Sequence, residues 1–96
     1  NDGWNGFMFA CYDNSDRVVK VMFENKSKHQ FDFNAKDCDG YTGFILACKY
    51  KEEKAVDLIL ANYKDLKIDL KIKNKAGQTG MSYWPEKFKG LNIEDV

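Results

Sequence analysis

The side chains best suited to metal binding or nucleophilic chemistry are three cysteines and one histidine: Cys11, Cys38, Cys48 and His29. A structural zinc site needs close ligand pairs, typically two cysteines separated by about two to four residues. No such pair exists, and an odd number of cysteines argues against a closed set of disulfides. We therefore expect no metal and no cofactor. Reduced cysteines are typical of an intracellular protein, and Cys11 and Cys48 end apolar runs that favour burial.

Other patterns that can support catalysis are weak. Residues 3–6 and 40–43 have the spacing Gly-x-x-Gly, but they lack the Gly-Lys-Ser/Thr ending of a phosphate-binding loop. Glu52 and Glu53 begin an expected helix, where carboxylates favour the positive end of the helix dipole. His29 has no nucleophile in a nearby motif, and a solvated loop position accounts for it. We expect no enzymatic activity.

Every second residue from 67 to 75 is charged, with lysine at 67, 71, 73 and 75 and Asp69 among them. Such a stripe can attract acidic partners, including RNA or phospholipid head groups. It is also what the solvated face of a half-buried strand provides. The formal net charge is zero, with 15 Lys and Arg against 15 Asp and Glu, and no apolar run is long enough to cross a membrane. We favour the solvated face and expect neither nucleic-acid nor membrane binding.

The elements that position these residues follow from an internal repeat. Identical residues recur 37 positions apart, among them the pairs Gly6/Gly43, Phe7/Phe44, Ala10/Ala47, Cys11/Cys48 and Val19/Val56. A third copy begins at Gly77 and Gly80. Periods of about 20–50 residues indicate stacked units that bury their apolar faces against one another. A repeat architecture points to an extended binding surface rather than a pocket.

The second copy shows what one unit contains. Residues 37–40, Asp-Cys-Asp-Gly, are typical of a turn, and Thr42 suits the N-cap of a helix. An apolar helix is expected over about 43–50 and a second, amphipathic helix over about 53–63. From Leu66 to Ile72 apolar and polar residues alternate, which predicts an extended strand with one packed face.

These units resemble ankyrin repeats, whose pattern is a β-turn followed by two helices, with Thr-Pro-Leu-His-x-Ala opening the first helix. The matching stretch is Asp37-x-x-Gly40-x-Thr42-Gly43-Phe44-Ile45-x-Ala47-Cys48. Residues 55–60 resemble the family's Val-Val-x-Leu-Leu-Leu, and residues 31–37 resemble its Ala-Asp-Val-Asn-Ala-Lys-Asp. The similarity covers residues 1–82. It implies an all-α repeat solenoid of stacked helix-turn-helix units with extended turn or β-hairpin arms.

Several features depart from the family pattern. The period is 37 rather than 33, and the additional residues fall at 26–30 and 63–67, where they should lengthen the second helix or its loop. Gly6, Gly43 and Gly80 replace the family proline. Glycine should weaken the start of each first helix by up to about 1 kcal/mol relative to alanine. The family histidine is also missing, so its hydrogen bond with threonine is lost.

The repeats are assigned as about 1–36, 37–73 and a partial or capping copy over about 74–96. In the third copy Trp84 stands where the others have alanine, and Pro85 either ends the helix or opens a new turn over 85–88. About three repeats are normally needed for stability. The chain also begins without Met, so we expect it to be a piece of a longer array or a small array braced by its tail.

The resemblance implies that a partner is bound by turn tips and by the exposed, concave face of the first helices. The positions concerned are Trp4, Tyr12, Asp13, Lys36, Asp39, Tyr41, Lys49, Tyr50, Lys75 and Gln78. Aromatic residues are enriched at protein interfaces, where buried anchors dominate affinity. For Trp4 and Tyr41, which follow turn glycines, packing over the neighbouring repeat is the alternative interpretation, and it is slightly favoured.

Two functions therefore remain. The first is a protein–protein interaction module that binds a partner protein, of unknown identity, along the concave face. The second is a structural segment that caps a longer ankyrin array, or self-associates through apolar surface at its open N-terminal end. A module should bind in isolation as a monomer, whereas a cap should dimerise or aggregate when alone.

Overall fold

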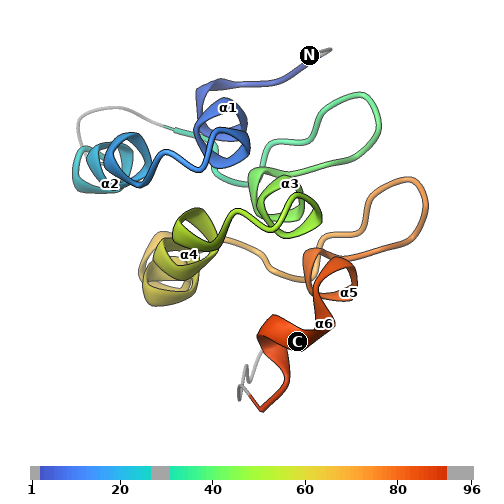
Figure 1. The fold of residues 1–96 in the computed structure, drawn as a ribbon. Helices are drawn as coiled ribbons and strands as arrows, with labels where there is room; N and C mark the ends of the chain where they lie inside the picture. Colours follow the sequence, from blue (N-terminus) through green and yellow to red (C-terminus); the bar gives the residue numbers. More distant parts are fainter. Residues whose placement is uncertain (1–2, 27–30, 91–96) are drawn as a thin grey trace.

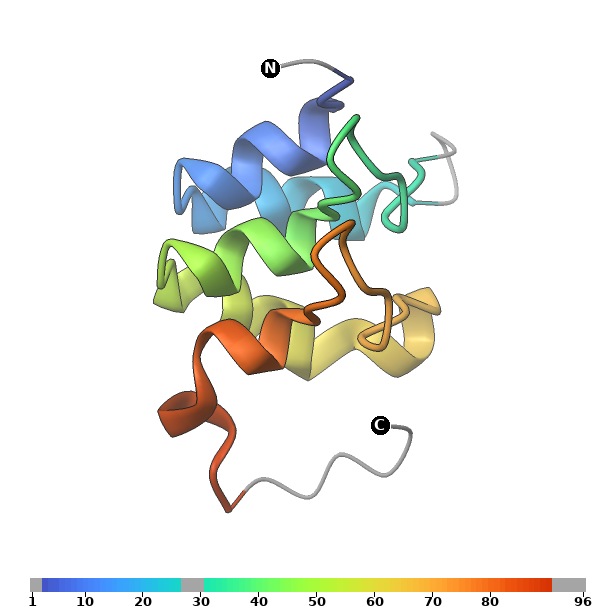
Figure 2. The same ribbon diagram turned by 90° about the vertical axis from the view of Figure 1, so that its right-hand side faces the viewer.

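The computed structural model describes residues 3–26 and 31–90 of the chain. It contains six helices: α1 (Gly6–Tyr12), α2 (Asp16–Glu24), α3 (Gly43–Lys49), α4 (Glu53–Leu66), α5 (Gly80–Tyr83) and α6 (Pro85–Phe88). Helices α1, α3 and α5 form one row, α2 and α4 lie behind it, and the connecting loops project to one side (Figures 1 and 2). The expected all-α class is confirmed.

Each helix of the front row begins with a glycine preceded by a side chain that caps it. Asn5 Oδ1 accepts a hydrogen bond from the Met8 N–H at 3.0 Å. Thr42 Oγ1 accepts one from the Ile45 N–H at 3.2 Å, and Thr79 Oγ1 accepts one from the Ser82 N–H at 3.4 Å. These bonds satisfy N–H groups that have no partner inside a helix. The predicted N-cap at Thr42 is confirmed.

The core joins both helix rows. Phe7 and Phe44 are the second residues of α1 and α3, and each is only 1% exposed. Val19 and Val56, on α2 and α4, are fully buried. These two pairs of residues, each identical in the two sequence copies, therefore have the same degree of burial. Cys11 and Cys48 are also completely buried and free, as expected.

The glycines that begin α3 and α5 permit close helix packing. A Cβ atom on Gly43 would lie 2.6 Å from Cε2 of Phe7, and one on Gly80 would lie 2.7 Å from Cε2 of Phe44. Real side chains do not approach one another this closely. The interpretation of these glycines as merely weak helix starts was incomplete, because their lack of a side chain makes room for the ring of the preceding front-row helix.

The predicted strand over residues 66–72 is wrong, and no strand occurs in the ranges that the structure describes. Leu66 is instead the last residue of α4, and Lys67 ends the helix in a left-handed conformation with φ of 58°. The alternating burial persists, because Ile68 and Leu70 are buried while Asp69 is exposed. Backbone groups here pair with side chains, as when the Asp69 N–H donates to Asn34 Oδ1 at 2.8 Å. The arms are therefore irregular loops rather than β-hairpins.

The additional residues of the second copy lengthen its helix. Helix α4 has 14 residues and continues past the expected end at 63, whereas α2 has nine. Tyr63 and Leu66 pack against the buried core, which gives the added turn of α4 its stabilising contacts. The sequence had left open whether the helix or its loop would lengthen.

The third copy ends in a different way from the first two. Helix α5 stops at Tyr83, before Pro85, and Pro85 is the first residue of the short helix α6, so both effects considered for this proline occur. The Phe88 ring lies 5.9 Å from the Phe44 ring, centroid to centroid. The expectations for His29 and for the tail beyond residue 90 concern positions outside the described residues. None of the described helices has the length and apolar character that crossing a membrane requires.

Candidate functional site

Aromatic side chains from the front row of helices and its loops meet on one face of the molecule. Trp4, which precedes α1, makes edge contacts with two rings of α1, at centroid distances of 5.1 Å to Phe9 and 5.3 Å to Tyr12. Tyr12 in turn lies 5.1 Å from Tyr50, which follows α3. Such edge-to-face pairs are a favoured arrangement of aromatic rings. We call this set, together with Tyr41 and Tyr83, the aromatic face.

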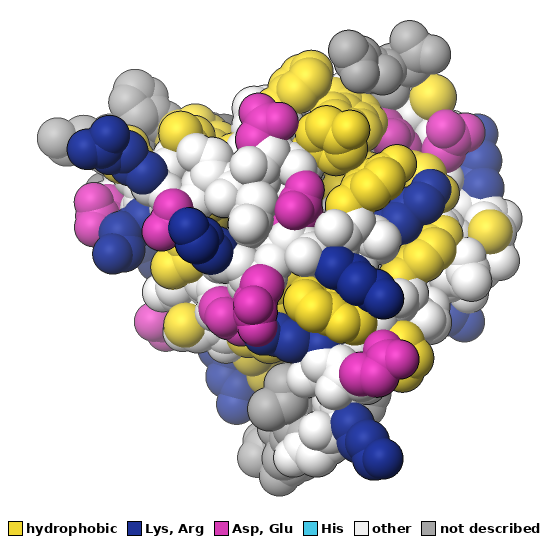
Figure 3. Space-filling view, in the orientation of Figure 1, with side chains coloured by type: hydrophobic (Ala, Val, Ile, Leu, Met, Phe, Trp, Pro, Cys, Tyr) yellow, Lys and Arg dark blue, Asp and Glu magenta, His cyan; other side chains and the backbone are white. Residues whose placement is uncertain are grey.

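Parts of the aromatic face are open to solvent. Phe9 and Tyr12 are each 41% exposed and Tyr50 is 47% exposed, whereas Trp4 and Tyr41 are half-buried. The space-filling view shows hydrophobic side chains with lysines among them over α1, α3 and the loop that leads into α3 (Figure 3). Exposed aromatic groups gathered in this way mark a candidate binding surface.

Lys49 lies among the tyrosines of this face. Its Nζ donates a hydrogen bond to the Tyr41 hydroxyl at 3.0 Å. The same nitrogen lies 4.7 Å from the Tyr41 ring centroid, 5.5 Å from that of Tyr50 and 6.0 Å from that of Tyr83. These distances place a cation over electron-rich ring faces. Lys49 therefore links the loop before α3 to the ends of α3 and α5.

The same contacts shift the pKa values of Lys49 and the tyrosines around it. The hydrogen bond with Tyr41 raises the pKa of Lys49, and it is also the main reason that the pKa of Tyr41 lies below its ordinary value. Burial raises the pKa of Tyr83, and hydrogen bonding to Tyr41 raises it further. Asn74 Nδ2 donates to the Tyr83 hydroxyl at 2.7 Å and so fixes the ring.

A carboxylate holds the loop between α2 and α3 in place. Asp37 Oδ2 accepts a hydrogen bond from Trp4 Nε1 at 2.8 Å, and its Oδ1 accepts from the N–H groups of Asp39 and Tyr41, both at 2.9 Å. Gly40 completes the turn with a φ of +83°, which favours glycine. The turn predicted over residues 37–40 is thus confirmed, and its carboxylate also orients Trp4.

A cleft of about 290 Å³ lies between this loop and the front row of helices. Its lining includes Trp4, Asp37, Asp39, Tyr41, Lys49 and Tyr50. Aromatic rings and charged groups thus share one concave site that opens beside the exposed rings of Tyr12 and Phe9.

Six of the ten residues expected to bind a partner lie in the aromatic face or its cleft: Trp4, Tyr12, Asp39, Tyr41, Lys49 and Tyr50. Asp13 follows α1 and lies near Glu52, whose pKa is raised by burial and by the Asp13 charge. Lys75 and Gln78 are exposed in the loop before α5, where the Lys75 N–H donates to the Asp39 carbonyl at 3.0 Å. Lys36 is exposed and does not line the cleft.

Three members of the site were missed by the sequence interpretation. Phe9 lies within an apolar run that reads as buried core, and only helix geometry shows it to be exposed. Tyr83 occupies the position of Leu46 in the repeat, which is 2% exposed in α3, so the repeat alone does not mark it as a surface residue. Asp37 was recognised as part of a turn, and its bond to Trp4 spans 33 residues of sequence.

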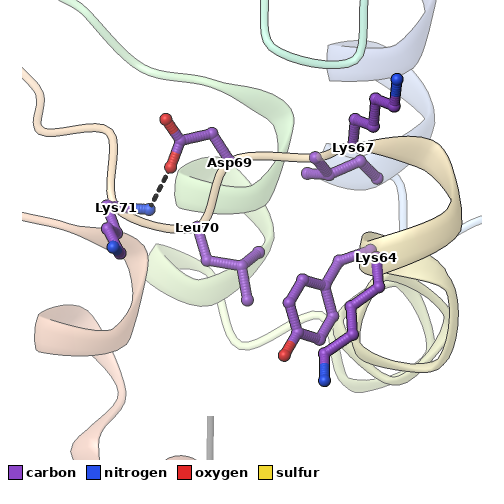
Figure 4. A pocket seen from close by; sticks show the side chains of 7 residues that line it. Lys64, Lys67, Asp69, Leu70 and Lys71 are labelled. Atoms are coloured by element: carbon purple, nitrogen blue, oxygen red, sulfur yellow. Dashed lines mark hydrogen bonds between the residues drawn. The ribbon is translucent and has the colours of Figure 1, made fainter. Parts of the chain in front are cut away.

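A larger cavity of about 510 Å³ lies at the end of α4 and carries Lys64, Lys67 and Lys71. These lysine side chains point in different directions rather than toward one point (Figure 4). The Lys71 N–H also donates to Asp69 Oδ1 at 2.9 Å, which places a carboxylate among them. This arrangement is a solvated basic surface and not a compact site for an anion.

The described residues offer no metal cluster, and two of the three cysteines are buried. Residues 3–26 and 31–90 contain no group of three or more His, Cys, Asp or Glu side chains that could hold a metal ion. Burial raises the pKa of the Cys11 and Cys48 thiols, so both stay protonated and unreactive. Cys38, in contrast, is exposed and lines the cleft.

No protein-family model matches this sequence, and a search of curated proteins found no similar protein.

Proposed function

We propose that this chain is an ankyrin-like protein–protein interaction module that binds a partner protein through its aromatic face. The observation that carries the proposal is the continuous contact of Trp4, Tyr12 and Tyr50, of which the two tyrosines are 41% and 47% exposed. Tyr and Trp combine large contact areas with few rotatable bonds, and they are enriched among the residues that dominate interface affinity.

The repeat architecture is part of this proposal. The front-row helices begin at Gly6, Gly43 and Gly80, which are 37 residues apart. The Phe7 ring lies against Gly43 in the same way as the Phe44 ring lies against Gly80. These equivalent contacts support stacked units with boundaries near residues 37 and 74, and a solenoid of this kind presents an extended surface to a partner.

A protein is a better partner for this face than a nucleic acid or a membrane. The formal net charge of the chain is zero, so no overall field attracts phosphates. The side chains of Lys64, Lys67 and Lys71 diverge (Figure 4), and α4 lies in the second row, behind the helices that carry the aromatic face (Figure 1). Three free cysteines support an intracellular location, where thiols stay reduced. The proposal includes no catalytic step and no cofactor.

The test uses the 96-residue chain as bait, with two matched variants. Tyr12→Ser/Tyr50→Ser removes two exposed rings of the aromatic face. Val18→Ser/Val21→Ser removes two exposed apolar side chains of α2, which are 46% and 50% exposed. A partner captured by crosslinking pull-down should bind the tyrosine variant at least about tenfold more weakly, because interface tyrosines typically contribute more than about 1 kcal/mol each. The valine variant should bind normally.

Equal binding by both variants, with circular dichroism showing that both are folded, would overturn the proposal. Capture of no specific partner by the wild-type chain would also count against it.

A second candidate function is self-association or capping of a longer array. The observation in its favour is the exposure of Val18 and Val21 on α2, which leaves apolar surface uncovered. If this function is correct, sedimentation velocity should show a concentration-dependent dimer that Val18→Ser/Val21→Ser abolishes. A monomer over the whole concentration range would exclude self-association by this surface.

A further inference from the structure

The cleft beside α3 has two chemically different sides. Asp37 and Asp39 lie on the loop side, whereas Lys49 lies among the tyrosine rings. The Asp37 carboxylate already accepts hydrogen bonds from three N–H groups. The Asp39 residue is exposed, and its carboxylate has no hydrogen bond or ion pair within the described part of the chain. Asp39 is therefore the carboxylate that remains available to a ligand.

The charges of the cleft favour a cationic guest. Its lining carries two carboxylates and one lysine, which gives a net charge of −1. The rings of Trp4, Tyr41 and Tyr50 add electron-rich faces that attract cations. Lys49 is already engaged by the Tyr41 hydroxyl and by these tyrosine rings. An acidic ligand would be attracted by one lysine and repelled by two carboxylates and several electron-rich ring faces.

The geometry of the lining favours a guanidinium over an ammonium group. A planar guanidinium can stack on an aromatic ring while its N–H groups donate to a carboxylate, and it loses hydration more easily than an ammonium. Trp4 and Asp39 offer a ring and a carboxylate in one cleft. Trp4 is held in place by its bond to Asp37 at 2.8 Å, so the ring is ordered before a guest arrives.

We propose that this cleft accepts an arginine side chain of the partner protein, with the guanidinium stacked on the aromatic lining and paired with the Asp39 carboxylate. The inference rests on the proposed function, because it names the chemistry by which the same face recognises its partner. Arginine is also among the residues that most often dominate protein interfaces, and the cleft gives it a defined position beside the exposed rings of Tyr12 and Tyr50.

The test is an NMR titration of the ¹⁵N-labelled chain with N-acetyl-arginine amide. N-acetyl-citrulline amide serves as the neutral probe of the same shape, and N-acetyl-glutamate amide as the acidic probe. The Trp4 indole N–H and the Asp39 amide report on the cleft. Arginine should shift both signals saturably, with a Kd on the order of millimolar for so small a ligand. Citrulline should bind at least about threefold more weakly, because it lacks the charge that pairs with Asp39.

Matched variants localise the effect. Asp39→Asn should weaken arginine binding about threefold, as expected for loss of a partly solvated ion pair. Asp65→Asn, which removes an exposed carboxylate of α4 outside this cleft, should leave arginine binding unchanged. Added salt should weaken arginine binding to the wild-type chain and have less effect on Asp39→Asn.

Equal binding of arginine and citrulline, tighter binding of the glutamate probe, absence of saturable shifts, or an unaffected Asp39→Asn variant would each overturn the arginine assignment. The proposed function is judged separately by capture of a partner. If a partner binds Asp39→Asn normally but does not bind Tyr12→Ser/Tyr50→Ser, the proposed function stands and only the arginine assignment is overturned. The probe titration needs no identified partner, so it tests the cleft in either case.

Discussion

Gly43 and Gly6 occupy equivalent positions of the repeat but have different surroundings. Both begin a helix of the front row, but only Gly43 lies against a ring. A Cβ atom at Gly43 would lie 2.6 Å from Phe7, whereas one at Gly6 would meet only Met22 Cε at 3.8 Å. The energetic cost of adding a methyl group at these glycines therefore depends on which side chain it would meet.

We expect Gly43→Ala to lower the free energy of unfolding by about 1–3 kcal/mol, because the buried Phe7 ring must move. Gly6→Ala should be neutral, or stabilising by up to about 1 kcal/mol, since alanine restricts the unfolded chain and favours a helix. Urea denaturation followed by circular dichroism measures both changes. Similar midpoints for the two variants would contradict the packing role of Gly43.

At the scale of elements, some helices depend on residues outside themselves. Helix α4 receives no side-chain hydrogen bond from its own N-cap residue, Glu52. Asn14, in the connection between α1 and α2, caps the helix instead. Its Oδ1 accepts hydrogen bonds from the N–H groups of Lys54 and Ala55 at 3.1 and 3.3 Å. This contact across 40 residues ties the two helix pairs together.

Replacing Asn14 with glycine should cost about 1 kcal/mol, the usual value of a helix cap, and should increase hydrogen exchange in the first turn of α4. Glycine is chosen because Asn14 has a φ of 54°, where alanine would add strain of its own. Lys51→Gly is the matched control, since Lys51 has a φ of 56° at the equivalent position and is exposed. Equal losses in both variants would refute the capping role.

One lysine of helix α6 forms ion pairs with α4. Lys87 Nζ lies 2.6 Å from Asp57 Oδ1 and 3.3 Å from Glu53 Oε2. The hydrogen bond to Asp57 is the main reason that the pKa of Lys87 lies above its ordinary value of 10.5. A raised lysine pKa means that the contribution to stability is complete below pH 10.5 and is lost as the pH rises through the folded-state value.

Lys87→Met should therefore lower the free energy of unfolding by about 1 kcal/mol at neutral pH. The difference from the wild type should shrink as the pH rises above 10.5. Urea titrations at a series of pH values measure this, with Lys54→Met as a control, because Lys54 is exposed and its side chain forms no ion pair within the described residues. A difference that is constant with pH would show that the ion pairs of Lys87 do not contribute to stability.

At the scale of the whole molecule, one core extends through both helix rows. Phe7 and Phe44 from the front row and Val19 and Val56 from the second row belong to the same buried cluster. Loops between the helices are linked as well, since the Lys75 N–H donates to the Asp39 carbonyl. The aromatic face is therefore carried by a scaffold whose parts stabilise one another, which limits the entropy that a partner would have to remove on binding.

The sequence alone determined the helical class, the spacing of the front-row helices, the turn at 37–40 and the buried state of Cys11 and Cys48. These features depend on local residue chemistry and on periodicity, and both can be read directly from the sequence. Six of the ten suggested binding residues could likewise be placed on one surface from the repeat and the family resemblance.

Tertiary structure decided the rest. Alternation over residues 66–72 predicted a strand, but a strand needs a hydrogen-bonding neighbour, and side chains such as Asn34 pair with that backbone instead. The exposure of Phe9 and the ring contacts of Tyr83 depend on which helix lies alongside, as does the close approach of Phe7 to Gly43. Contacts between residues more than 30 positions apart are set by how helices pack, and no local pattern in the chain encodes them.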